Sequence, residues 1–591
     1  MAGLFYDGRA FGEGILPPRA ESAHARASPA TNPRSSTASQ TSQYVGSEAC
    51  SRCHAEIFSH YSSTEMGRSL TPATPEFLGT VPVSASVYDQ KLDRHFDVHS
   101  ENGKLYQSEY QVDPVGHEVF RNTHEIKWIV GTGANGRGGL IQHDDYIFEA
   151  PLSYYRETGS WALSPGYERG DLGFNRTIAP GCIFCHSGRP QPVDGTIGKY
   201  QKPPFTQLSV GCENCHGPGS AHVEAMGMGD SYPKGKDPTI VNPGGIAPAR
   251  ANDLCMSCHQ TGDIRVFQPG KTYLDFRPGQ PLDRVTAILM VPPTRENPPR
   301  EDHVEHYYSM ILSKCYRASA SLPSEKQMRC ISCHDPHIEP TSEEAPAYFN
   351  DKCMSCHTAQ SCKASAQVRA QTLSVTSPAD NCIGCHMPKR AGGAISHTSL
   401  TNHRIVAQPD EPFPDAAFAM TTTALPDLIY LDAAPGDAAP PALTLLQAYS
   451  QLKDESPAYE ASFLKTLHEL ETTAPENAIV QATLGHQSLT AGQLENATQH
   501  LQASLKLDPA QAAVYVDLSA VADQSGRAAE AVAMAQKAVV LEPFNAPMQK
   551  TLVLRLINAK QYPEAEAAME KYLENFPEDD FMRKMLAIAK Q

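Results

Sequence analysis

The 591-residue chain lacks several features that would place it in a common class of protein. No run of 18 or more apolar residues occurs, so the sequence predicts no membrane span. Basic residues are few, because 49 Lys and Arg stand against 66 Asp and Glu and give a formal net charge of −17. This balance argues against a nucleic-acid partner, since no basic face is available to neutralise phosphates. The length instead predicts about three or four soluble, globular domains.

An export signal is also missing from the start of the sequence. The first 45 residues are rich in Arg, Pro, Ser and Ala and contain no continuous apolar segment. This composition predicts a disordered leader over residues 1–45. We expect the export signal to lie upstream of this sequence or to have been removed.

Cysteine is absent after residue 385, and the composition changes soon afterwards. Residues 411–440 are rich in Ala, Pro and Asp without a sustained period, which predicts a linker. Beyond it, Pro475, Pro509, Pro543 and Pro577 recur every 34 residues, and Ala497, Ala531 and Ala565 keep the same step; Gly485 fills the small position of the first repeat, which Ser519 and Val553 take later. That period is typical of tetratricopeptide repeats, whose helix pairs bury their apolar faces only by stacking. Residues 441–591 are therefore predicted to form an all-α solenoid with repeats near 478–511, 512–545 and 546–579, a degenerate pair near 444–477 and a terminal helix.

The region between residues 46 and 410 is predicted to be a domain of loops and short helices with a β-rich insertion at about 80–175. The insertion alternates apolar and polar residues, and Glu101-Asn102-Gly103 predicts the turn of a hairpin. Elsewhere Pro and Gly interrupt most regular patterns. We expect bound cofactors, rather than a large apolar core, to fill this domain.

The cofactors are indicated by the motif CxxCH, which occurs seven times in this region. Its cysteines are Cys50 and Cys53, Cys182 and Cys185, Cys212 and Cys215, Cys255 and Cys258, Cys330 and Cys333, Cys353 and Cys356, and Cys382 and Cys385. The histidines that complete the motifs are His54, His186, His216, His259, His334, His357 and His386. The two thiols of such a motif add across the vinyl groups of a haem, and the histidine binds its iron.

Zinc is the main alternative, because it also binds CxxC pairs, but a zinc ribbon places no demand on the next residue. With 23 His in 591 residues, a chance His after all seven pairs has a probability on the order of 10⁻¹⁰. The sequence therefore predicts seven covalently bound haem c groups. Only about 50 residues serve each haem, so we expect the haems to lie close together and form an electron path.

Further histidines are candidates for the sixth ligand of each iron. The strongest is His222, which follows the third motif across a Gly-Pro-Gly turn in GCENCHGPGSAH. Because the peptide has to pass around the haem edge to reach its own distal face, we expect His222 to serve a neighbouring haem. The other candidates are His337, His397, His403 and at least one of His303 and His306.

Two assignments stay open from the residues alone. At the first haem, Met66 would raise the potential relative to two histidines, but His60 and an ordinary core role for Met66 are alternatives. Cys315 and Cys362 lie outside the motifs. In an oxidising compartment they are candidates for a disulfide, and two buried thiols are the alternative.

The segments YVGSEACSRCHAEIF, VGTGANGRGGL, CENCHGPGSAH, CISCHDPH and CIGCHMPK resemble the multihaem cytochrome c family related to nitrogen-cycle tetrahaem cytochromes, in versions fused to tetratricopeptide repeats. The resemblance covers about residues 44–591. It implies that the motif cysteines attach haem c and that the motif histidines ligate iron.

The leading functional hypothesis is an electron carrier whose repeats dock a redox partner protein. The alternative is an oxidoreductase with one open-site haem that acts on a small nitrogen compound. The chain lacks the CxxCK variant typical of pentahaem nitrite reductases and has enough histidines to close every site, which favours the carrier. Because thioether attachment takes place outside the cytoplasm, we expect a periplasmic or otherwise extracytoplasmic protein.

Overall fold

The structure is a computed structural model and describes residues 42–133, 135–167, 170–233, 235–260, 262–299, 306–365, 367, 381–388, 401–408, 410–420, 428–434 and 436–591. The predicted leader up to residue 41, together with His303 and His397, lies outside these residues. The described residues divide into two compact units. Unit 1 comprises residues 42–67 and 211–466, and unit 2 comprises residues 68–210 and 467–591.

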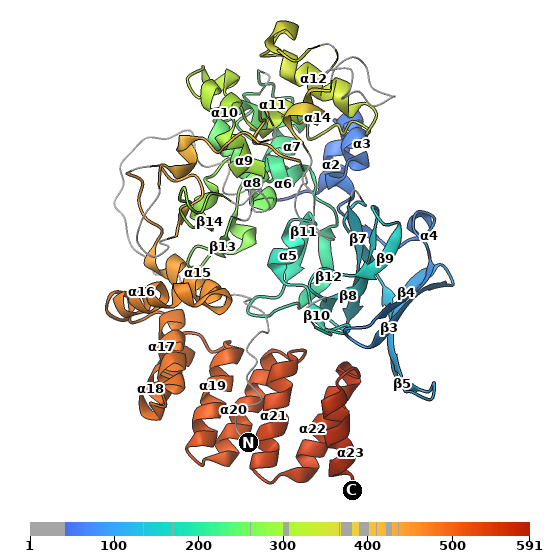
Figure 1. Cartoon of the computed structure of the whole chain (residues 1–591), viewed down its shortest axis with the longest axis vertical. Helices are drawn as coiled ribbons and strands as arrows, with labels where there is room; N and C mark the ends of the chain where they lie inside the picture. The colour runs from blue at the N-terminus through green and yellow to red at the C-terminus, as the bar shows by residue number, and fades with distance from the viewer. Residues whose placement is uncertain are drawn as a thin grey trace. The chain divides into compact units, whose positions relative to one another are not determined.

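The N-terminal part of unit 2 is rich in β-structure, as predicted (Figure 1). Its strands are β1 (Leu70–Pro72), β2 (Ser84–Asp89), β3 (Arg94–Glu101), β4 (Lys104–Val112), β5 (Glu118–Ile126), β6 (Trp128–Val130), β7 (Gly136–His143), β8 (Tyr146–Tyr155), β9 (Ser160–Leu163), β10 (Arg176–Thr177), β11 (Arg189–Pro192) and β12 (Tyr200–Gln207). Helices α4 (Pro75–Leu78) and α5 (Pro180–Phe184) accompany them.

Two antiparallel sheets of this part share one core. One sheet has the order β2-β3-β4-β5, and the other has the order β1-β6-β7-β8-β10 with β9 paired to β8. Phe96 and Leu105 from the first sheet and Phe148, Leu152 and Trp161 from the second are buried together. Strand β3 alternates buried and half-buried residues, as a strand with one face toward the core does, whereas β7 and β8 are buried over runs of four consecutive residues.

The predicted hairpin turn is confirmed at the β3–β4 connection. Glu101 pairs with Lys104, and the two residues between them, Asn102 and Gly103, have φ values of 52° and 75°. Positive φ at both central positions is what a two-residue hairpin of this twist requires, and Asn-Gly adopts it at low cost.

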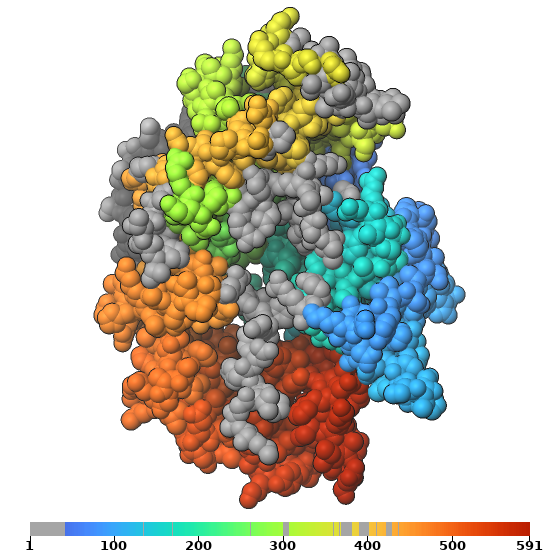
Figure 2. Space-filling model, in the orientation of Figure 1, coloured from blue at the N-terminus to red at the C-terminus, as the bar shows by residue number. Residues whose placement is uncertain are grey.

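The C-terminal part of unit 2 is all helical, as predicted, and forms the red surface in Figure 2. Its helices are α17 (Ala478–Thr490), α18 (Leu494–Leu507), α19 (Ala512–Gln524), α20 (Ala528–Leu541), α21 (Ala546–Asn558), α22 (Tyr562–Asn575) and α23 (Asp580–Ala589). Each pair repeats the same 34-residue step. A Cβ at Gly485 would come within 2.6 Å of the Leu501 side chain, which explains the small residue where α17 and α18 cross.

Within unit 2 the turns between repeats pack on the β-rich part. Phe544 contacts Tyr146 and Phe148, with ring centroids 4.8 and 5.0 Å away, and joins the core of the two sheets. One repeat later, Arg94 donates to the backbone oxygen of Glu578 at 2.8 Å. The edge of the solenoid near its proline turns is therefore a contact within unit 2.

Unit 1 consists mainly of short helices and loops. Its helices are α2 (Ser47–Ser51), α3 (Ala55–Ser63), α6 (Cys212–His216), α7 (Ser220–Gly227), α8 (Pro248–His259), α9 (His306–Leu312), α10 (Lys314–Ser319), α11 (Cys330–Cys333), α12 (Ala345–Met354), α14 (Cys382–His386) and α15 (Ala442–Glu455), and α16 (Glu460–Thr473) crosses the boundary between the units. A small sheet contains β13 (Ile264–Phe267), β14 (Thr286–Met290) and β15 (Ile429–Tyr430).

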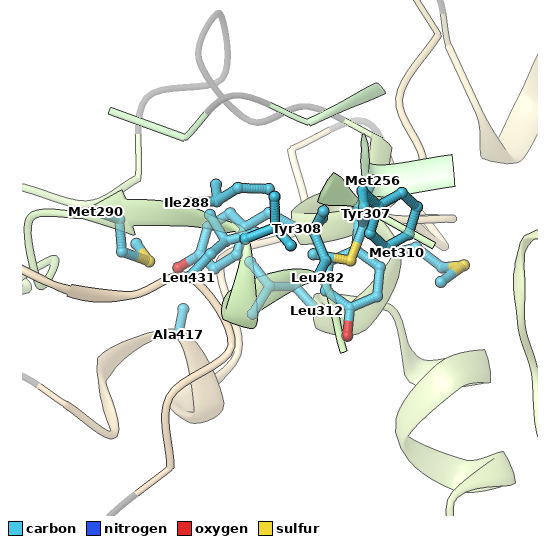
Figure 3. Packing of buried hydrophobic residues seen from close by; sticks show 12 residues of the cluster. Met256, Leu282, Ile288, Met290, Tyr307, Tyr308, Met310, Leu312, Ala417 and Leu431 are labelled. Carbon is cyan, nitrogen blue, oxygen red and sulfur yellow. The ribbon is translucent and has the colours of Figure 1, made fainter. Parts of the chain in front are cut away.

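The segment predicted as a linker, 411–440, contributes to the core of unit 1. Its residues 429–430 form β15, which pairs with β14, and Ala417 and Leu431 are buried beside Ile288, Tyr307 and Tyr308 (Figure 3). Burial of apolar residues such as Leu431 stabilises this Pro- and Ala-rich stretch against the rest of unit 1, which its composition alone did not reveal. Among the described residues, no helix combines the length and apolar character needed to cross a bilayer.

A buried charge cluster joins β3 and β4 to the start of α23 within unit 2. The Arg94 guanidinium lies 2.8 Å from Asp171 and 3.6 Å from Glu109, with Asp580 at 3.9 Å. Glu109 and Glu578 are 0% and 8% exposed. Burial first, and then Asp171 and Asp579, raise the pKa of Glu578 from 4.5 to about 8, while Arg94 opposes the rise. Burial and Asp171 likewise raise the pKa of Glu109.

We expect the stability of unit 2 to fall as the pH rises from about 4.5 to 8, because over this range folded Glu578 keeps a proton that the unfolded chain has lost. The Glu578→Gln variant, which stays neutral, should melt at a temperature that changes less between pH 5 and pH 8. Melting of both proteins at the two pH values measures this, with the exposed Glu574→Gln as control. An equal pH dependence in wild type and Glu578→Gln would contradict the assignment.

Candidate functional site

All seven CxxCH motifs lie on or at the end of helices, six in unit 1 and the second motif on α5 in unit 2. A helical turn places residues three apart on one face, so both thiols of a motif point the same way. All 16 cysteines are free thiols. Cys315 and Cys362 are among them, so the structure has no disulfide between these two residues. Cys315 is half-buried and Cys362 is exposed, so they are not two buried thiols either.

Six motifs of unit 1 form three pairs. The first cysteines of the paired motifs lie side by side: Cys50 with Cys212, Cys255 with Cys330, and Cys353 with Cys382. The helices that carry these cysteines are in contact in the same combinations, α2 with α6, α8 with α11, and α12 with α14. The motifs therefore pair as first with third, fourth with fifth, and sixth with seventh.

Three motif histidines of unit 1 each face a histidine that lies outside the motifs. The rings of His54 and His222 have centroids 6.3 Å apart with planes 19° from parallel. His216 faces His337 at 6.0 Å and 14°. His334 faces His403 at 6.2 Å and 28°. Three motif histidines thus each lie opposite one of the histidines predicted as sixth ligands.

These separations fit two imidazoles on opposite sides of one iron. Metal–imidazole bonds of about 2 Å place the two ligating nitrogens about 4 Å apart, and the ring centroids lie about 1 Å further out on each side, which gives about 6 Å in total. The spacing of the three pairs therefore leaves room for a metal between the two rings.

Hydrogen bonds orient several of these histidines through Nδ1. His216 Nδ1 lies 2.8 Å from the Val241 carbonyl oxygen, and His386 Nδ1 lies 2.8 Å from that of Val406. His403 Nδ1 lies 3.0 Å from the Thr401 oxygen. A carbonyl only accepts, so Nδ1 carries the hydrogen and Nε2 keeps its lone pair for a metal.

His222 is oriented by a carboxylate. Its Nδ1 lies 2.7 Å from Oδ2 of Asp237, and both side chains are mostly buried, at 21% and 18% exposed. Asp237 is itself fixed by the backbone N–H of Thr239, which donates to Oδ1 at 2.7 Å. A carboxylate on the outer nitrogen fixes the ring orientation and makes Nε2 more basic toward a metal.

His306 at the start of α9 lies near the fourth motif. Its ring centroid is 5.4 Å from that of His259 and 4.8 Å from that of His403. Burial, followed by the neighbouring histidines, lowers the pKa of His306 to about 3, so the imidazole is neutral. Neutral imidazole is the form that binds metals.

Other predicted ligands are placed differently. Met66 lies in the 3₁₀ turn η1 (Met66–Arg68) and His60 is exposed on α3, whereas the position opposite His54 is taken by His222. This arrangement favours His222 over Met66 and His60 at the first motif. His303 and His397 lie outside the described residues.

Two important residues of this site were missed by the sequence reasoning. Asp237 lies 15 residues after His222 in a loop, without a motif that marks it. Glu213 is the second residue of the third motif, is 5% exposed and accepts backbone hydrogen bonds from Val45, Gly46 and Gly219 at 2.8–3.1 Å. The charge of Glu213 could have indicated this role, because haem attachment does not require a carboxylate between the two cysteines of a motif.

Two comparisons with known proteins bear on the class of protein. Residues 168–217, which include the second and third motifs, match the family model described as cytochrome c554 and c-prime. A curated relative, the multiheme cytochrome MtrA of Shewanella baltica (strain OS185), is 26% identical over 185 residues. That match covers 30% of this chain and 52% of the relative, so the chain spans about half the length of the curated relative. The two matches support the interpretation as a multihaem cytochrome.

Three solved structures are each similar to a part of this chain. The crystal structure of MamA protein is 20% identical over 23% of this chain and 73% of its own, with a TM-score of 0.21. The first TPR of Spaghetti (RPAP3) bound to an HSP90 peptide is 18% identical over 19% and 93%, with a TM-score of 0.18. The Sgt2 TPR domain from Aspergillus fumigatus is 22% identical over 19% and 76%, with a TM-score of 0.18.

We expect the Glu213→Gln variant to be destabilised by about 1–3 kcal/mol, because an amide nitrogen cannot accept and leaves buried backbone N–H groups unpaired. Thermal or denaturant unfolding of the full chain with its cofactors measures the loss. Glu224→Gln, an exposed change on α7, is the matched control. Unfolding of Glu213→Gln indistinguishable from both other proteins would show that these hydrogen bonds contribute little.

Proposed function

We propose that this protein is a c-type cytochrome that carries electrons along a chain of seven covalently bound haems. Bound haem supplies one-electron redox chemistry, whose potential depends on the axial ligands and on burial. The protein's own residues attach, orient and separate the cofactors. The residues present fit haem c, because every motif has two free thiols for attachment and a histidine to bind iron.

The observation that carries the proposal is that a histidine following one motif faces the histidine of another motif. His222 follows the third motif and faces His54 of the first, so it connects the two members of one pair. His337 follows the fifth motif and faces His216 of the third, and His403 follows the seventh motif and faces His334 of the fifth. These contacts connect all three pairs of unit 1 in one series.

We assign His222, His337 and His403 as sixth ligands at the first, third and fifth motifs, and His306 at the fourth. Asp237 and the carbonyls of Val241 and Thr401 accept the Nδ1 hydrogens of His222, His216 and His403, so that Nε2 of each would be the nitrogen that binds iron. Tyr61 packs edge-on against His337, with centroids 6.4 Å apart, and limits rotation of that ring. We assign no sixth ligand at the second, sixth and seventh motifs; His303 and His397 were predicted as ligands without a particular iron, and Met66 was predicted for the first haem, where His222 is assigned instead.

The same proposal includes location and partners. Haem attachment through thioethers implies maturation outside the cytoplasm, so we place the protein in the periplasm or another extracytoplasmic space. The tetratricopeptide pattern and its stacked helix pairs support docking of a redox partner protein on the repeats. Because the turns of Phe544 and Glu578 contact the β-rich part, the partner would use the remaining faces of the solenoid.

We expect the purified protein to contain seven haems per chain, attached so that acid acetone does not extract them. Pyridine haemochrome absorbance against protein mass measures the number. Low-temperature electron paramagnetic resonance of the oxidised protein should show low-spin iron. A stoichiometric high-spin haem that binds nitrite or hydroxylamine would instead support the alternative, an oxidoreductase acting on a small nitrogen compound.

We expect His222→Ala to convert one haem per chain from low spin to high spin, because it removes the ligand opposite His54 while leaving both attachment cysteines. His468→Ala, an exposed change on α16, should leave the spectrum unchanged. Spin quantification against haem content measures the conversion. Retention of wholly low-spin iron in His222→Ala would remove His222 from the ligand set.

A further inference from the structure

In each of the three motif pairs, one polar side chain of the first helix bonds to the backbone of the second. Ser47 Oγ accepts from the N–H of Cys212, Asn252 Oδ1 from that of Cys330, and Asn350 Oδ1 from that of Cys382. All three distances are 3.1 Å. The same hydrogen bond thus occurs in three places that are far apart in the sequence.

The three side chains also occupy the same register. Each lies three residues before the first cysteine of its own motif, and each accepts from the first cysteine of the partner motif. That donor is the first residue of helices α6, α11 and α14, where a helix has no internal partner for its N–H group. The three pairs are therefore built to one plan, with Ser and Asn as interchangeable acceptors.

Asn252 has the closest contact with an attachment point. Its side chain is 1% exposed, and Oδ1 also lies 3.3 Å from Sγ of Cys330, the thiol that attaches a haem in the proposed function. Its Nδ2 is buried and has no hydrogen-bond partner among the described atoms. Burying the amide nitrogen of Asn252 without a partner costs free energy. We infer that Asn252 is retained for the hydrogen bond of its oxygen with Cys330.

We propose that Ser47, Asn252 and Asn350 are positioning residues that set the offset between the two haems of each pair. This inference rests on the proposed function. Because each haem would be attached covalently to its helix, the hydrogen bond that fixes one helix against the other also fixes the two macrocycles. The second motif provides the contrast: its Cys182 N–H bonds to the oxygen of Ala179 in its own segment.

The test compares Asn252→Ala with Asn252→Ser in the full protein carrying its haems. Circular dichroism in the Soret band reports coupling between neighbouring haems, and redox titration reports their potentials. Asn252→Ala should alter the Soret couplet and shift the potentials of two haems, with the haem count unchanged. Asn252→Ser should restore both signals, because Ser47 makes the same bond in the first pair.

Asn477→Ala is the matched control, since Asn477 accepts from the N–H groups of Ile479 and Val480 at the start of α17 in the repeats. It removes a comparable helix cap and should change the melting temperature without changing the Soret couplet. Ser47→Ala, tested with Ser47→Asn as its rescue, covers the case in which Asn252→Ala fails to fold. A normal couplet and normal potentials in a fully loaded alanine variant, or no rescue by the conservative variant, would overturn the inference. A wild-type haem count that is not seven would instead overturn the proposed function.

Discussion

The structure of unit 1 depends on one constraint: its attachment helices are too short to be stable by themselves. Helices α2, α6, α11 and α14 have only four or five residues, and isolated helices of that length do not form in water. Each is held by a partner helix whose first cysteine lies beside its own. The organisation of the motifs in pairs is therefore a condition for folding as well as for bringing cofactors close together.

The facing histidines connect the three motif pairs of unit 1 in a series. The peptides that follow the third, fifth and seventh motifs each carry a histidine that faces another motif, so the first, third and fifth motifs combine residues from two distant segments. Asp237 holds the His222 ring through Nδ1, and backbone carbonyls hold His216 and His403 in the same way, so the lone pair of Nε2 stays available to a metal. Orientation is supplied by residues outside the motifs, which is why the motifs alone do not define the site.

Unit 2 is organised differently, around apolar sheets and stacked helices. The β-rich part has a conventional core between two sheets, and the repeats supply their own. Phe544 and the cluster of Arg94, Glu109, Asp171 and Glu578 join these parts within the unit. The repeat region is thus an integral part of the folded unit, and one of its edges is used inside the chain.

The sequence by itself determined the local features of this protein. Seven CxxCH motifs, the Asn102-Gly103 turn and the 34-residue period each follow from chemistry or geometry between near neighbours, and short-range rules predict such features well. The sequence also indicated that His222 serves a motif other than its own, because the ring of its own haem would block a six-residue peptide. In contrast, it gave no sign that residues 429–430 complete a sheet, since their partner strand lies far away in the chain.

Only the tertiary structure decided which histidine faces which motif and which motifs form pairs. Twelve residues separate His54 from Met66, and 168 separate it from His222, yet it is His222 that faces His54. The same holds for Asn252 and Cys330, which are brought together across 78 positions. The spacing of a motif specifies what its residues can bind. Which residue lies opposite is decided by contacts between segments remote in sequence, and those contacts depend on tertiary packing that no local pattern encodes.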